Sequence, residues 1–333
     1  MKNVSVVISI SFLVFITLSC KESTEPEQPA NPWTTYTISD GLPYNSIGAI
    51  AFEPDGDLWC VPLVSDIGGG VVHYDGKTWE QYTTQEGLAT NMILWYENAV
   101  TLSSDGIVWI ATFGGGVSKY DGQTWTTYTT EDGLLSNLVA AVAVGPNGDL
   151  WCAHPVPEGG ISHFDGNNWT VYTPSDLGVS FCSFTSLAFD QNGTLWAGGG
   201  VVVSFDGSTW TSFSSETWME QPIALYMDIS QDGKIWITGN GVSSYDGTTW
   251  KFYSFEEIGI VSNQERIIPL AVDTDNILWV GYMGNGVFRF DGNAWSKFTT
   301  ENGPNLSNVI SISIAPDGAL WFGTENGIHR YQP

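Results

Sequence analysis

Basic residues are scarce in this chain of 333 residues. Only 10 Lys and Arg stand against 36 Asp and Glu, which gives a formal net charge of -26. Binding to nucleic acid or to anionic lipid headgroups requires clustered basic side chains, so both are excluded as direct partners. The simplest interpretation of the acidity is a well-solvated surface, and a cation-binding role is the alternative.

Cysteine and histidine are rare as well, with 4 of each. No Cys-x-x-Cys or His-x-x-x-His pattern is present, so we expect no metal site and no cofactor. Three cysteines follow Cys20, so at most one disulfide can form among them, and Cys152 with Cys182 is the only pair to consider. The glycine triplets lack the Lys-Ser/Thr ending and the helix of a phosphate-binding loop.

One long apolar run is present, from Val4 to Leu18. A membrane span needs about 20 residues, so this shorter run, preceded by Lys2, predicts a secretory signal peptide over residues 1–19. Thr17-Leu18-Ser19-Cys20 resembles a bacterial lipobox, and we expect lipidation at Cys20; ordinary secretion with another cleavage site is the alternative. Residues 20–32 are rich in Pro and Glu and predict a disordered tether.

A repeat fills the rest of the chain. Asp/Asn-Gly-x-Leu-Trp is followed by a Gly-rich turn and by Val-x-x-Tyr-Asp-Gly-x-x-Trp-x-x-Tyr. The first tryptophan of the unit occurs at Trp59, Trp109, Trp151, Trp196, Trp236, Trp279 and Trp321. The second occurs at Trp33, Trp79, Trp125, Trp169, Trp210, Trp250 and Trp295. We expect these residues to pack between the repeats.

Each unit divides into four short antiparallel strands, A to D, and no segment has a helical period. Units of roughly 40–45 residues with four strands predict an all-β, seven-bladed β-propeller over residues 33–333. A solenoid is the competing architecture. The first unit supplies only a D strand, at residues 33–36, and the last ends after strand C, so we expect the N-terminal strand to complete the last blade and close the ring.

The repeat resembles that of the two-component regulator propeller family. Residues 109–120 (WIATFGGGVSKY) and 320–331 (LWFGTENGIHRY) are its closest matches, and the likeness extends over residues 33–331. In that family such propellers commonly form periplasmic sensor regions of hybrid histidine kinases. No kinase or receiver segment follows the propeller in this sequence, so we expect no phosphotransfer by this chain itself.

Strand order predicts two different faces. The A–B and C–D hairpins, built on Asn-Gly or Asp-Gly, share one face, where a turn-forming role accounts for the aspartates without calcium. The D–A connections and B–C turns share the other face, and their variable lengths favour that face for binding. Its long segments are residues 61–69, 154–160, 214–222 and 254–266, with extra residues near 92–98.

Off-pattern residues on this second face are the candidate ligand-binding residues. Trp95 and Trp218 are the two tryptophans that the repeat does not explain, and an indole can stack on sugars or aromatic groups. Arg266 stands where other blades are apolar, and a guanidinium suits a carboxylate or sugar hydroxyls. The alternatives are local packing for the tryptophans and, for Arg266, an ion pair with Glu256, Glu257 or Glu265. Tyr96, Phe113, His154 and Tyr282 complete the candidate set.

These observations favour a monomeric, non-catalytic lipoprotein in the periplasm or at the cell surface. Its membrane contact would be the lipid alone, and its ligand a glycan, a peptide or an envelope protein. A lyase or hydrolase acting on a saccharide or cyclic peptide is one alternative, and a structural partner in envelope assembly is another. The carboxylates available on the variable-loop face are Asp66, Glu97, Glu158, Glu216, Glu220, Glu256 and Glu257.

Overall fold

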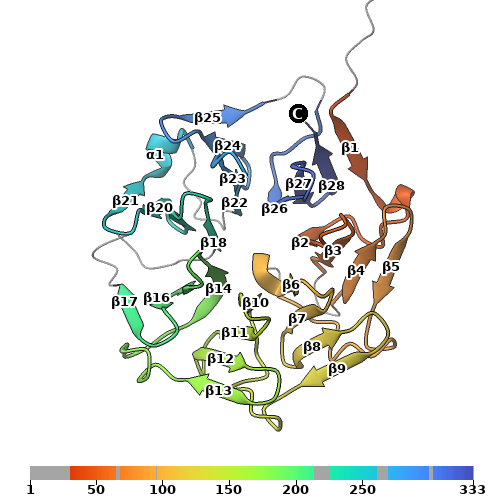
Figure 1. Ribbon diagram of the computed structural model, residues 1–333. Helices are drawn as coiled ribbons and strands as arrows, with labels where there is room; N and C mark the ends of the chain where they lie inside the picture. Colours follow the sequence, from red (N-terminus) through yellow and green to blue (C-terminus); the bar gives the residue numbers. More distant parts are fainter. Residues whose placement is uncertain are drawn as a thin grey trace, which may run out of the picture. The chain divides into compact units, whose positions relative to one another are not determined.

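A computed structural model describes residues 31–64, 68–94, 96–213, 226–260, 269–299 and 303–332. The described chain from Pro32 onward forms seven four-stranded antiparallel sheets arranged around one axis, which confirms the predicted propeller (Figure 1). Within the described ranges no helix is long and apolar enough to cross a membrane. The predicted signal peptide, Cys20 and nearly all of the tether lie outside the described residues.

The first three blades follow the chain in order, each with strand A innermost. Blade one is β2 (Ile47–Phe52), β3 (Leu58–Pro62), β4 (Val71–Tyr74) and β5 (Trp79–Tyr82); blade two is β6 (Val100–Leu102), β7 (Val108–Thr112), β8 (Gly116–Tyr120) and β9 (Trp125–Tyr128); blade three is β10 (Ala141–Val144), β11 (Leu150–His154), β12 (Gly160–Phe164) and β13 (Trp169–Tyr172).

The remaining blades repeat this plan. Blade four is β14 (Phe184–Phe189), β15 (Leu195–Gly199), β16 (Val202–Phe205) and β17 (Trp210–Phe213); blade five is β18 (Tyr226–Ile229), β19 (Ile235–Thr238), β20 (Val242–Tyr245) and β21 (Trp250–Tyr253); blade six is β22 (Leu270–Val272), β23 (Leu278–Tyr282), β24 (Gly286–Phe290) and β25 (Trp295–Phe298); blade seven is β26 (Val309–Ile314), β27 (Leu320–Thr324), β28 (Gly327–Tyr331) and β1 (Trp33–Tyr36). The described helices are single turns: η1 (Ile38–Asp40), η2 (Glu97–Ala99) and α1 (Phe255–Ile258).

The ring closes as the terminal repeats predict. β1 pairs antiparallel with β28, with Trp33 opposite Tyr331 and Tyr36 opposite Ile328. The Trp33 ring lies 4.8 Å from that of Tyr331, and the Tyr36 ring stacks on Trp321 at 5.5 Å. This seam joins the first and last strands of the propeller, which lie side by side in Figure 1.

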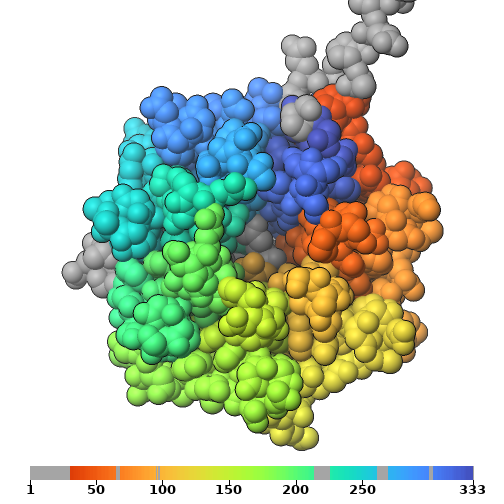
Figure 2. All heavy atoms as spheres, in the orientation of Figure 1, coloured from red at the N-terminus to blue at the C-terminus, as the bar shows by residue number. Residues whose placement is uncertain are grey.

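Aromatic side chains fill the spaces between blades. The strand-B residue Trp109 of blade two packs on Tyr128 of the same blade and on Phe164 of blade three. Phe164 in turn stacks on Trp169, the first residue of its own strand D, at 4.8 Å. The same arrangement recurs around the ring, so both repeated tryptophans are packing residues, as predicted, and neighbouring blades are in contact (Figure 2).

The repeated aspartates and glycines have local structural roles. The C–D hairpin aspartates each accept backbone N–H groups two and three residues ahead, and these hydrogen bonds lower their carboxyl pKa values; examples are Asp121 and Asp165. In the Gly-rich turn, Gly116 has φ +81°, and a Cβ there would collide with the Tyr128 carbonyl oxygen. Turn geometry therefore accounts for both residue types.

The cysteines Cys60, Cys152 and Cys182 are free and buried. Burial raises the pKa of the Cys182 thiol to about 11 and that of Cys152 well above its usual value. All three therefore act as small apolar packing groups, and the Cys152–Cys182 disulfide that the sequence allows is absent.

Candidate functional site

The strand order separates two faces of the disc. Because the strands of a blade alternate in direction, the A–B and C–D hairpins share one face, which we call the hairpin face. The D–A connections and B–C turns share the opposite face, which we call the loop face. On the hairpin face the turns are uniform and held by aspartates, so the loop face is where the blades differ.

Part of the loop face is nevertheless repetitive, which sequence reasoning missed. Five D–A connections open with a Thr or Ser whose backbone N–H and hydroxyl both donate to a carboxylate three residues on: Thr37–Asp40, Thr83–Glu86, Thr129–Asp132, Thr173–Asp176 and Ser254–Glu257. A buried Leu or Ile follows each, at Leu42, Leu88, Leu134, Leu177 and Ile258. The pattern Thr-x-x-Asp/Glu-Gly-Leu, at Thr37, Thr83 and Thr129, and the related Thr/Ser-x-x-Asp/Glu-Leu/Ile-Gly, at Thr173 and Ser254, could have shown that these segments are caps rather than free loops.

Several predicted site residues fall outside the described ranges. Trp95, Trp218 and Arg266 do, as do Asp66, Glu216, Glu220 and Glu265, and the side chain of Glu97 is not described. Tyr96 is described: it is half-buried immediately before η2, and burial raises its pKa. Phe113 lies in the B–C turn of blade two with 39% of its surface exposed.

His154 and Tyr282 lie inside their blades rather than on the loop face. Both have 0% exposure and occupy the last position of strand B, where Thr112 and Thr324 stand in blades two and seven. The His154 ring nitrogens contact the Leu138 carbonyl oxygen at 2.9 Å and the Ser162 hydroxyl at 2.8 Å. Burial lowers the pKa of His154 to about 4, so the ring is neutral and held in place. Tyr282 packs on Phe255 at 5.4 Å.

Exposed apolar side chains gather on the loop face of blades two to four. We define the apolar arc as Met92 (43% exposed), Phe113 (39%), Val156 (44%) and Phe181 (63%), which come from successive loops in blade order. Neighbouring segments of the arc are bonded: the Phe113 N–H donates to the Met92 carbonyl at 2.9 Å. The Val156 N–H donates to the hydroxyl of Ser183, two residues beyond Phe181, at 3.3 Å.

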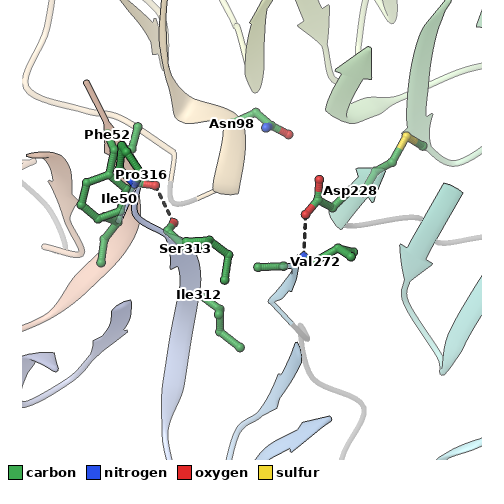
Figure 3. A pocket seen from close by; sticks show the side chains of 12 residues that line it. Ile50, Phe52, Asn98, Asp228, Val272, Ile312, Ser313 and Pro316 are labelled. Atoms are coloured by element: carbon green, nitrogen blue, oxygen red, sulfur yellow. Dashed lines mark hydrogen bonds between the residues drawn. The ribbon is translucent and has the colours of Figure 1, made fainter. Parts of the chain in front are cut away.

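The central channel holds a second feature, a cavity of about 440 Å³. Its walls come from strand A of blades one, five, six and seven and from η2 (Figure 3). The lining includes the second half of β2, Ile50 to Phe52, and Pro316 of an A–B hairpin, so the cavity lies in the half of the channel nearer the hairpin face.

Asp228 is the charged residue of this lining. Its carboxylate accepts the N–H of Val272 in blade six at 2.8 Å and that of Ile229 at 2.7 Å. Burial outweighs these two bonds and raises the pKa of Asp228 to about 6. On the far side of the cavity Asn98 projects from η2, and its amide oxygen accepts the Leu187 N–H at 3.4 Å. Sequence reasoning did not single out either residue.

The register shows that Asp228 departs from the repeat. It pairs with the strand-B tryptophan Trp236. The residues paired with that tryptophan in the other blades are small: Ala51, Thr101, Ala143, Ala188, Ala271 and Ser313. Aligning the repeats on this tryptophan would have revealed the aspartate from sequence alone.

No family model matches the sequence, and no curated protein matches it either. Solved structures do match. The extracellular domain of a protein described as a hybrid two-component system (BT3049) from B. thetaiotaomicron is 20% identical, with a TM-score of 0.68, over 90% of this chain and 41% of that one. This chain therefore spans less than half of that structure.

Two further structures have other roles. A streptogramin B lyase is 16% identical, with a TM-score of 0.67, over 90% of this chain and 97% of the lyase. PorZ, a surface component of the type-IX secretion system of Porphyromonas gingivalis, is 18% identical, with a TM-score of 0.68, over 87% of this chain and 47% of PorZ. At these identities the likeness establishes the fold, and the chain has the propeller architecture that sensor, secretion and lyase proteins share.

Proposed function

We propose that this protein is an exported, non-catalytic binding module whose loop face takes an apolar segment of a peptide or partner protein. The observation that supports this most directly is the apolar arc. Of the six large hydrophobic side chains exposed among the described residues, four form the arc, and a fifth, Ile38, also lies on the loop face. Grouped exposed apolar side chains on a rigid scaffold are typical of interaction surfaces.

The chemistry of the arc favours a protein segment over a glycan. Two phenylalanines, a methionine and a valine offer apolar contact and few hydrogen-bonding groups, whereas sugars require both aromatic faces and polar partners. Methionine adapts to differently shaped apolar partners. A glycan remains the alternative ligand, through Trp95, Trp218 and Arg266.

Two of the three candidate carboxylates that are described on the loop face have local structural roles. Glu158 accepts the Ser136 hydroxyl at 3.2 Å, and Glu257 accepts both polar groups of Ser254. These bonds hold Glu158 and Glu257 in place, whereas Glu256 is exposed. All four histidines are described; His154 and His329 are buried, and His73 and His163 pack on Trp59 and Trp151 beside carboxylates. A histidine-based lyase mechanism has no exposed candidate among them.

The predicted lipid anchor would leave this surface unobstructed. Strand D starts on the hairpin face, so the chain enters the propeller there, at Trp33. The loop face is on the opposite side of the propeller, away from this point of entry.

The proposal can be tested by selecting peptides on the immobilised protein and measuring their affinity by calorimetry. We expect F113S/F181S to weaken a selected peptide at least tenfold, because each phenylalanine contributes about 1–2 kcal/mol of apolar contact. The matched control is V171S, which alters a residue of similar exposure (39%) on the outer strand β13.

A parallel panel of polysaccharides addresses the alternative ligand. Glycan binding that W95A/W218A abolishes and F113S/F181S leaves unchanged would reject the peptide proposal and favour the glycan. Peptide binding that all of these variants retain would show that the loop face is the wrong surface.

A further inference from the structure

Asp228, the carboxylate of the channel cavity, lies at a position where the fold does not require a charge. Ser313, its counterpart in blade seven, also links its blade to the next: the Ser313 hydroxyl donates to the Ile50 carbonyl oxygen of blade one at 2.7 Å. In the remaining blades the position holds Ala or Thr. A neutral or apolar residue is therefore sufficient for closing the ring, and the charge of Asp228 calls for another explanation.

Asp228 lacks a cationic partner within the described ranges of the chain. None of the described Lys, Arg or His side chains forms an ion pair with it. Its partners are the two backbone N–H groups, and each carboxylate oxygen keeps a further lone pair. The side chain is partly accessible, so a small solute can reach it.

The cavity around the carboxylate has a definite chemical character. Its walls combine apolar and polar groups: Phe52, Val272 and Ile314 are half-buried apolar residues of the lining, and Asn98 and Ser313 supply neutral polar side chains. Its volume of about 440 Å³ is in the range of small-ligand pockets. Such a site suits a molecule with one cationic, hydrogen-bonding end and an apolar body.

We infer that the channel is a binding site for a primary ammonium group carried on a small apolar chain or ring, with Asp228 as the counter-ion and the Asn98 amide oxygen facing the same space. The ammonium donates hydrogen bonds to the free lone pairs of Asp228, and Phe52, Val272 and Ile314 contact the apolar part. The net charge of -26 raises the local concentration of such cations.

A divalent metal ion fits the cavity less well. Calcium takes six to eight oxygen ligands, usually with several carboxylates. Among the described residues no three His, Cys, Asp or Glu side chains converge, and Asp228 is the one carboxylate of the lining. A single carboxylate among neutral polar and apolar groups matches a single N–H-bearing cation.

Backbone-amide NMR can locate such a ligand. The Val272 N–H donates to the Asp228 carboxylate at 2.8 Å, whereas Met92 belongs to the apolar arc on the loop face. Titration of the full chain with n-hexylammonium should shift the Val272 amide resonance and leave that of Met92 unchanged. 1-Hexanol and hexanoate are the matched neutral and anionic probes, and hexyltrimethylammonium retains the charge without N–H donors.

The decisive variant is D228N, which keeps the side-chain shape and an acceptor for Val272. We expect n-hexylammonium to bind it at least about tenfold more weakly, as the loss of a charge-assisted hydrogen bond predicts. E131Q is the control, because Glu131 is exposed in a D–A connection and its substitution changes the net charge equally. If D228N folds poorly, D228S reproduces the residue of blade seven.

Three outcomes would overturn the inference. One is an equal affinity of wild type and D228N for n-hexylammonium. Another is an affinity of the wild type for 1-hexanol that equals its affinity for n-hexylammonium. The third is the absence of any shift of the Val272 amide resonance up to about 10 mM ligand. Each outcome would leave Asp228 as an acceptor between blades five and six. None bears on peptide binding by the apolar arc, which the Met92 resonance reports separately.

Discussion

Blade seven and blade five each contact the next blade through a polar side chain at the same position of strand A, but the two side chains differ in charge. At the strand-A position beside the strand-B tryptophan, each uses a polar side chain to bond to the strand A of the next blade. Blade seven uses the neutral Ser313, and its seam with the N-terminal strand is otherwise held by aromatic packing around Trp33 and Tyr36. Blade five uses the ionised Asp228.

The residues of the blade-seven seam stabilise the ring, whereas Asp228 is accommodated in the ring without a need for its charge. The seam contacts are neutral and centre on the buried Trp33, and they stabilise the fold directly. A carboxylate withdrawn from water without a counter-charge among the described residues lowers stability at neutral pH. A position that costs stability where a neutral residue is sufficient is a candidate for function.

Removing the seam aromatic should have the largest effect. Trp33 has 7% exposure and packs on Phe298, Phe322 and Tyr331. W33A creates a large cavity between blades six and seven, so we expect a loss of about 3–5 kcal/mol in the free energy of unfolding. Urea unfolding followed by circular dichroism measures it. A loss below about 1 kcal/mol would mean that β1 contributes little to closure.

Much of this seam was predictable from the sequence, since residues 33–36 form only a D strand and the last repeat lacks one. The roles of the repeated tryptophans and hairpin aspartates were also predictable, because each has one structural use per blade. His154 and Tyr282 were not recognised as framework residues, although both replace the threonine that ends strand B in blades two and seven. Because both residues depart from the repeat, we expected them on the exposed loop face. The strand pairing instead places both at buried positions.

The candidate sites were less accessible to sequence reasoning. The apolar arc combines residues from separate loops, and their exposure depends on how each loop is capped. Asp228 stands out when the repeats are aligned on the strand-B tryptophan, but the sequence of its strand, Tyr-Met-Asp-Ile, does not show which side faces the channel. The cavity itself is formed by four blades and η2, so its volume and lining follow only from ring closure.

Adding a charge to blade seven at the position equivalent to Asp228 should have the next largest effect. In S313D the carboxylate would face the Ile50 carbonyl oxygen, which now accepts the Ser313 hydroxyl, so an attraction becomes a repulsion. We expect a loss of roughly 2–3 kcal/mol at pH 7.5, from the lost bond and the buried charge. S313A, which removes only the hydroxyl, is the control. Equal losses in S313D and S313A would show that the channel tolerates charge at any blade.

Replacing Asp228 of blade five by a neutral residue should have the smallest effect on the free energy of unfolding, and it should stabilise the fold. Burial raises the pKa of Asp228 to about 6, above the ordinary value near 3.9, so the folded state holds the proton more tightly than the unfolded chain. The ionised form therefore costs stability above pH 6, and this cost disappears as the pH falls toward 4. We expect D228N to gain about 1–2 kcal/mol at pH 7.5 and almost nothing at pH 4.

Urea midpoints of wild type and D228N across this pH range measure the gain. A loss of stability that is the same at pH 7.5 and pH 4 would show that Asp228 acts through the shape of its bond to Val272 rather than through its charge. A gain confined to high pH would show that the chain retains a destabilising carboxylate in its channel. Added n-hexylammonium should then raise the midpoint of the wild type more than that of D228N, because a ligand stabilises only the form that binds it.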